Sequence, residues 1–107
     1  MQHGTIIDIQ SRDYWFKVVE MLQQNWALID INGDSTAIVY FMHDGGGVFD
    51  QMVFSSKTDA ETGLLHNGFK LYAKDEEAQK FIKNPEPPFR VARHPNGRIY
   101  SSGKFWF

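Results

Sequence analysis

The chain has 107 residues, of which 42% are hydrophobic and 22% are charged, and this composition predicts one globular domain spanning residues 1–107. It contains no cysteine, which excludes disulfide bonds, thiolate catalysis and thiolate metal sites. The net charge of −2 is unevenly distributed: residues 1–68 carry nine acidic and three basic residues, whereas residues 69–107 carry four and eight.

The sequence shows neither the pattern of a signal peptide nor that of a membrane-spanning segment. Residues 1–5 lack the basic region followed by an apolar stretch that begins a signal peptide. The longest apolar run, residues 37–42, is far shorter than the roughly 20 residues that a membrane span needs. Together with the lack of cysteine, these features predict a cytoplasmic protein with no membrane contact.

The first two predicted elements are a strand and a long helix. Residues 5–9 are short and β-branched, which is typical of a strand. Over residues 12–25 the apolar side chains recur at helical spacing, which predicts an amphipathic helix packed across one face of a sheet. Ser11 is positioned to cap the first turn of this helix. The apolar stripe consists of Trp15, Val18, Val19, Leu22 and Trp26.

The middle of the chain predicts a meander of three antiparallel strands, over residues 26–31, 37–42 and 48–54. Asn32-Gly33 is a strong hairpin signal, because both residue types tolerate the positive φ of a type I′ turn. The strand at 37–42 is apolar on both faces, so we expect it at the centre of the sheet and covered on both sides. The glycines at 45–47 predict the second turn.

Two short helices are predicted after the meander. The first covers residues 58–67, where Thr58 and Glu61 have the spacing of a capping box. The second covers residues 75–83, in which acidic residues come first and lysines last, an order that suits the helix dipole. A brief strand is predicted between them at residues 69–72.

The last third of the chain predicts a hairpin with strands at 89–93 and 98–102, followed by an edge strand at 104–107 that offers a route to a homodimer. The expected fold class is therefore α+β. Its sheet is mainly antiparallel and twisted, and is built from the N-terminal strand, the meander and the C-terminal hairpin. One long amphipathic helix packs on a face, and one or two short helices complete the fold.

A candidate partner-binding site lies at the two ends of the predicted central strand. Asp30 and Asp34 precede that strand, and His43, Asp44 and Asp50 follow it. The two groups are separated by roughly 26 Å of extended chain, so their carboxylates are too far apart to bind one metal ion. No metal or cofactor is predicted, because no histidine or glycine spacing fits a known binding motif.

The absence of catalytic motifs, the acidic first two thirds and the surplus of aromatic residues predict a small non-enzymatic protein-binding module. An inhibitor or immunity-type protein that blocks a basic partner has this size and charge. Two alternatives remain open. One is a small acid–base hydrolase that uses His94 or His43. The other is nucleic-acid binding through a basic, aromatic patch formed by Arg90, Arg93, His94 and Arg98, against which the isoelectric point near 6.0 argues.

Overall fold

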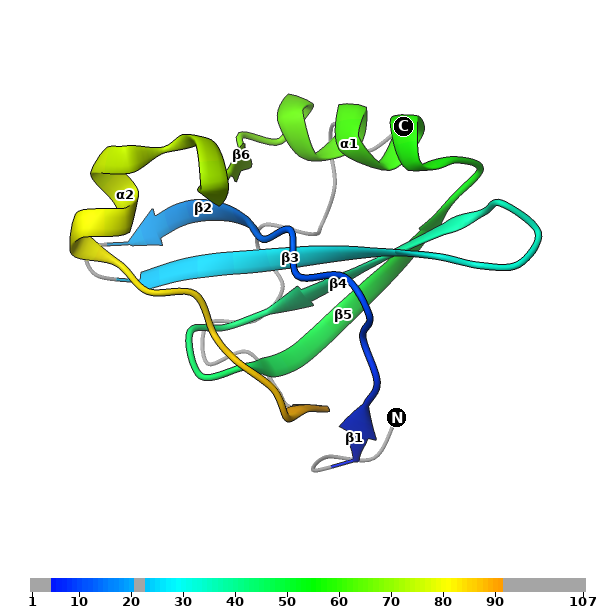
Figure 1. The fold of residues 1–107 in the computed structure, drawn as a ribbon, viewed down its shortest axis with the longest axis horizontal. Helices are drawn as coiled ribbons and strands as arrows, with labels where there is room; N and C mark the ends of the chain where they lie inside the picture. Colours follow the sequence, from blue (N-terminus) through cyan, green and yellow to red (C-terminus); the bar gives the residue numbers. More distant parts are fainter. Residues whose placement is uncertain (1–4, 21–22, 92–107) are drawn as a thin grey trace.

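Seven strands in residues 5–20 and 23–91, the part of the chain that this computed structural model describes, join into one mixed sheet (Figure 1). Two α-helices in the same described residues complete a small α+β domain, α1 (Lys57–His66) and α2 (Glu76–Phe81). The strand order is β1-β7-β5-β4-β3-β2-β6, and neighbouring strands are antiparallel except for β5 and β7, which are parallel. The strands are β1 (Ile6–Ile7), β2 (Trp15–Glu20), β3 (Gln23–Ile31), β4 (Ala37–Met42), β5 (Gly47–Phe54), β6 (Lys70–Leu71) and β7 (Phe89–Val91).

The long helix predicted over residues 12–25 is wrong, because this part of the chain forms β2 and the start of β3. Trp15 lies opposite Ala27, and Phe16 lies opposite Trp26, in an antiparallel ladder. Trp15 and Trp26, which the helical stripe placed on one face, belong to apolar clusters on opposite faces of the sheet. Strands buried on both faces lose simple alternation, and their aromatic and β-branched residues then mimic helical spacing.

The predicted meander is confirmed, and it is longer than expected because β2 precedes it. Strands β3, β4 and β5 pair antiparallel over most of their lengths. Strand β4 is covered on both faces, since Val39 and Phe41 pack in one apolar cluster and Tyr40 and Met42 in the other. Its two-sided apolar pattern therefore correctly indicated a central strand.

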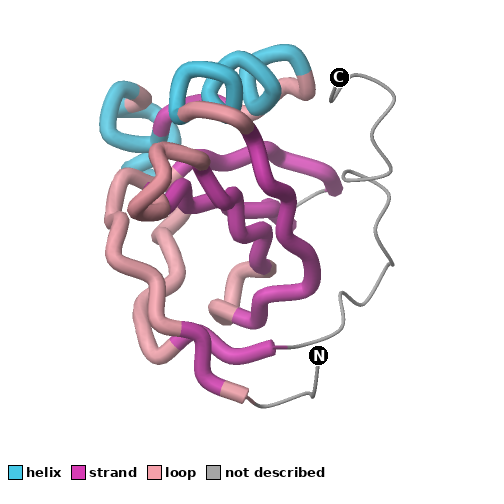
Figure 2. Tube along the Cα trace, turned by 90° about the vertical axis from the view of Figure 1, so that its right-hand side faces the viewer, coloured by secondary structure: helices cyan, strands magenta, loops and turns pink. Residues whose placement is uncertain are grey.

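Helix α1 covers one face of the sheet, against β3, β4 and β5. Segments before β2 and after α2 pass over the other face and contribute Ile9, Tyr14 and Ile82 to its core, in which Phe89 of β7 also lies. Figure 2 shows the two helices together above the strands and the long connecting loops along one side. The sheet is thus enclosed by different parts of the chain on its two faces.

The hairpin predicted at Asn32-Gly33 is present, but its turn differs from the expected type. The backbone N–H of Asn32 donates to the carbonyl of Thr36, and the N–H of Ser35 donates to the carbonyl of Asn32. Ser35, with φ of 72°, takes the left-handed conformation that the sequence predicts for Asn32 and Gly33. This is the three-residue loop in which a type I turn is followed by one left-handed residue.

The two short helices lie close to their predicted positions. The capping residue of α1 is Ser56, whose Oγ accepts from the N–H of Asp59, and not the predicted Thr58. Asp75 caps α2 in the same way, by accepting from the N–H of Ala78. Within the described residues, neither helix is long and apolar enough to cross a bilayer. The predicted strands at 98–102 and 104–107 lie outside the described residues.

Candidate functional site

The register of the meander places the five predicted partner-binding residues in two groups. Asp30 and Asp34 lie at the β3–β4 hairpin, and His43 and Asp44 at the β4–β5 turn, at the opposite end of β4 (Figure 1). Asp50 lies within β5, opposite Phe41, and is half-buried. These residues therefore do not form one site.

In the first group, both carboxylates accept hydrogen bonds from the backbone. Asp30 accepts from the N–H groups of Gln10, at 2.9 Å and 3.1 Å, and of Ser11, at 2.8 Å. These bonds fasten the segment before β2 to the end of β3. Asp34 accepts from the N–H and the hydroxyl of Thr36, and this interaction holds the carboxyl pKa below its usual range.

In the second group, Asp44 is tied to the core. One carboxylate oxygen accepts from Nε1 of Trp26 at 2.9 Å, and the other accepts from the N–H of Gln24 at 3.4 Å. The Trp26 side chain is fully buried, and its indole N–H needs an acceptor there. Asp44 therefore has a structural task that the sequence did not indicate.

His43 forms a local turn of its own. Its Nδ1 accepts from the N–H of Gly45 at 2.9 Å, two residues along the chain. A neutral imidazole has one acceptor nitrogen, so Nε2 carries the proton in this arrangement. An imidazole held in this way lacks the free acceptor that a general base needs, which weakens the hydrolase alternative for His43.

Protonation of His43 should destabilise the folded protein. Burial lowers the His43 pKa, and the nearby Asp44 carboxylate opposes this shift only in part. The unfolded chain, with a pKa near 6.5, then binds the proton more readily, so the contribution of His43 to stability is present above that pH. It is lost as the pH falls through the lower pKa of the folded state.

Urea unfolding of the wild type and of His43→Asn, measured between about pH 7.5 and pH 5, tests this effect. Asparagine keeps a side-chain acceptor for the N–H two residues on, but it does not titrate. We expect the wild type to lose more stability on acidification than the variant does. Parallel pH profiles would show that His43 has no such influence.

A hollow of about 620 Å³ lies where the segment before β2 meets β3 and α1, and we call it the acidic groove. Asp13, Asp30 and Glu61 line it, together with one lysine, Lys57. The carboxylates outnumber the ammonium group, so a cationic side chain is favoured there. Its apolar lining consists of Trp15, Ile29, Ile31 and Leu71.

Sequence reasoning predicted only Asp30 of the charged residues in this groove. Asp13 falls within the wrongly predicted helix over residues 12–25, and Glu61 within a capping box that does not form. Ser11, also expected to cap that helix, instead accepts at Oγ from the N–H of Asp13. These residues come together through tertiary packing between β2, β3 and α1, which leaves no local signal in the sequence.

The alternative basic patch is only partly visible. Arg90 lies on β7 and is exposed. Arg93, His94 and Arg98 lie outside the described residues, so the nucleic-acid alternative stays a prediction. Among the described residues, no group of three or more histidine, aspartate or glutamate side chains is arranged to hold a metal ion.

Comparison with known proteins adds no functional information. No protein-family model matches the chain, and neither curated proteins nor solved structures show significant similarity to it.

Proposed function

We propose that this chain is a small non-enzymatic protein-binding module that engages a basic partner, in the manner of an inhibitor or immunity-type protein. The observation that carries the proposal is the acidic groove, which three carboxylates and four apolar side chains line together. Interfaces combine buried apolar anchors with charged rims that steer the partner, and this groove offers both features.

The apolar part of the groove supports a protein partner over a small cation. Trp15 and Ile29 are buried in its floor, whereas Ile31 is half-exposed at 52%. A side chain that carries a positive charge on an apolar stem matches this pattern, because the stem covers the apolar floor while the charge meets the carboxylates. An arginine or lysine on the surface of the partner has this chemistry.

Asp13 and Glu61 are the residues to test, because neither carboxylate accepts a hydrogen bond within the described part of the chain. Asp30 and Asp44 are unsuitable, since each holds backbone or core groups in place. The double variant Asp13→Asn/Glu61→Gln should lower the association rate with the basic partner by about tenfold, and added salt should lower the wild-type rate as well.

The experiment captures proteins from extracts of the native cell on immobilised wild type and on the double variant, and identifies them by mass spectrometry. The control, Glu76→Gln/Glu86→Gln, removes two exposed acidic groups outside the groove. We expect a basic protein that the wild type and the control retain and the groove variant loses. If the captured protein is retained equally at high salt and by the groove variant, the proposal is refuted.

A further inference from the structure

A second hollow, of about 520 Å³, lies between β2 and α2, and we call it the strand–helix groove. It shares no lining residue with the acidic groove. One wall carries Lys17, Val18 and Lys70, from β2 and β6. The other wall carries Glu77 and Phe81, from α2.

Two apolar side chains on this groove are exposed to an unusual degree. Phe81 at the end of α2 is 81% exposed, and Val18 on β2 is 59% exposed. A lone exposed valine needs no explanation, but a phenylalanine with most of its ring in water beside an apolar hollow is typical of an interface anchor. The Phe81 ring and the strand–helix groove therefore form one continuous surface.

The outer edge of β2 also faces this groove. The two-residue strand β6 pairs with Trp15 and Phe16, and no described strand continues along that edge beyond Phe16. The pairing of β2 with β3 is irregular between Val18 and Glu20. Bulged, lysine-bearing edges resist strand addition, so the groove is suited to side-chain packing and not to a new strand.

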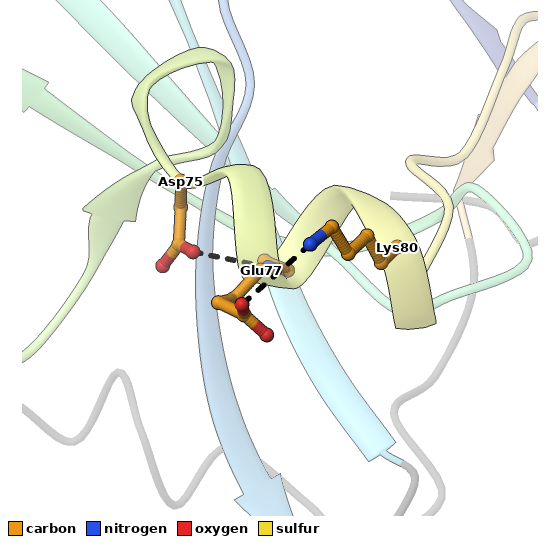
Figure 3. A network of polar contacts seen from close by, with 4 residues as sticks. Asp75, Glu77 and Lys80 are labelled. Carbon is orange, nitrogen blue, oxygen red and sulfur yellow. Dashed lines mark hydrogen bonds and ion pairs between the residues drawn. The ribbon is translucent and has the colours of Figure 1, made fainter.

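The charges of the groove are self-complementary. Lys17 and Lys70 lie on the strand wall, whereas Asp75 and Glu77 lie on the helix wall. Figure 3 shows Asp75 at the start of α2 and Glu77 turned toward Lys80. The Glu77–Lys80 pair spans 3.7 Å and both side chains are largely exposed, so it contributes little and leaves Glu77 able to meet another cation.

We propose that the strand–helix groove binds a second copy of this chain in a two-fold symmetric dimer. Symmetry presents the same surface from both copies, so the lysine wall of each copy meets the acidic wall of the other. Phe81 of each copy enters the groove of its partner beside Val18. This interface is independent of the proposed function, because the two grooves share no lining residue.

Analytical ultracentrifugation over a wide range of protein concentration tests the dimer. We expect the wild type to associate reversibly and Phe81→Ser to raise the dissociation constant by about tenfold or more. Leu65→Ser removes an equally apolar and 59% exposed side chain from α1, away from the groove, and should change nothing. A wild type that stays monomeric at every concentration, or an equal loss in Leu65→Ser, would overturn the proposal.

A charge exchange gives a second, independent test. Lys70→Glu and Glu77→Lys should each weaken the dimer, because each places like charges face to face across the two-fold axis. The combined variant Lys70→Glu/Glu77→Lys restores opposite charges and should associate within about threefold of the wild type. Circular dichroism confirms folding of all variants. If the double variant dimerises more weakly than either single variant, the lysine wall of one copy does not face the acidic wall of the other.

Discussion

Trp26→Ala is expected to lower the free energy of unfolding by about 3–5 kcal/mol, the cost of removing a large aromatic side chain from a packed core. The Trp26 side chain is fully buried. Its ring meets Tyr14, Phe16 and Tyr72, with centroids 6.0 Å, 5.9 Å and 5.1 Å away. Truncation would leave a cavity on the face of the sheet that the connecting loops cover.

Urea unfolding followed by far-ultraviolet circular dichroism measures this cost. Leu65→Ala, on the exposed side of α1, is the matched control and should change stability by no more than about 0.5 kcal/mol. If Trp26→Ala costs as little as the control does, the indole is not the centre of this core. If the variant is already unfolded without urea, the milder Trp26→Phe gives a lower limit for the cost.

Asp44→Ala is expected to cost about 1–3 kcal/mol, although the side chain lies at the surface. The substitution leaves the indole N–H of Trp26 without its 2.9 Å acceptor in a buried position. The cost should shrink when Asp44→Ala is made in a Trp26→Phe background, because the buried indole donor is then absent and only the longer bond from the Gln24 N–H is lost. Asp13→Ala, another exposed carboxylate, should be nearly neutral.

The double-mutant cycle of Asp44→Ala and Trp26→Phe therefore measures the coupling directly. Equal costs of Asp44→Ala in both backgrounds would show that the carboxylate does not act through the indole. The result also bears on partner binding, since a variant of Asp44 that binds poorly has first to be shown to fold. Asp44 is thus a poor probe of an interface, despite its exposure.

The chain from Trp26 to Phe81 was largely predictable because its elements carry local signals. The Asn32-Gly33 turn, the two-sided apolar strand at 37–42 and the acidic start of α2 are each short-range patterns. The helix prediction for residues 12–25 was wrong because Trp15 and Trp26 have helical spacing by coincidence, whereas their neighbours favour strands. Only the pairing of β2 with β3 decides between helix and strand, and that pairing depends on tertiary structure.

Only the acidic character of the candidate site was predictable from the sequence. The excess of acidic residues before residue 69 is visible in the sequence, and the separation of Asp30 from Asp44 follows from the strand between them. The acidic groove was not predictable, because it depends on how the segment before β2, which carries Asp13, packs beside α1, which carries Glu61. The tie of Asp44 to Trp26 likewise spans two strands.

The pairing of β1 with β7, which lies beside β5 in the sheet, affects the order in which the fold is assembled. Among the described strands, β1 pairs only with β7, so Ile6 finds its partner Arg90 across almost the whole described chain. Strands β2 to β5 join by short connections and are complete once residue 54 has been synthesised. Contacts between residues so far apart in sequence form slowly, so β1 must wait while the meander folds.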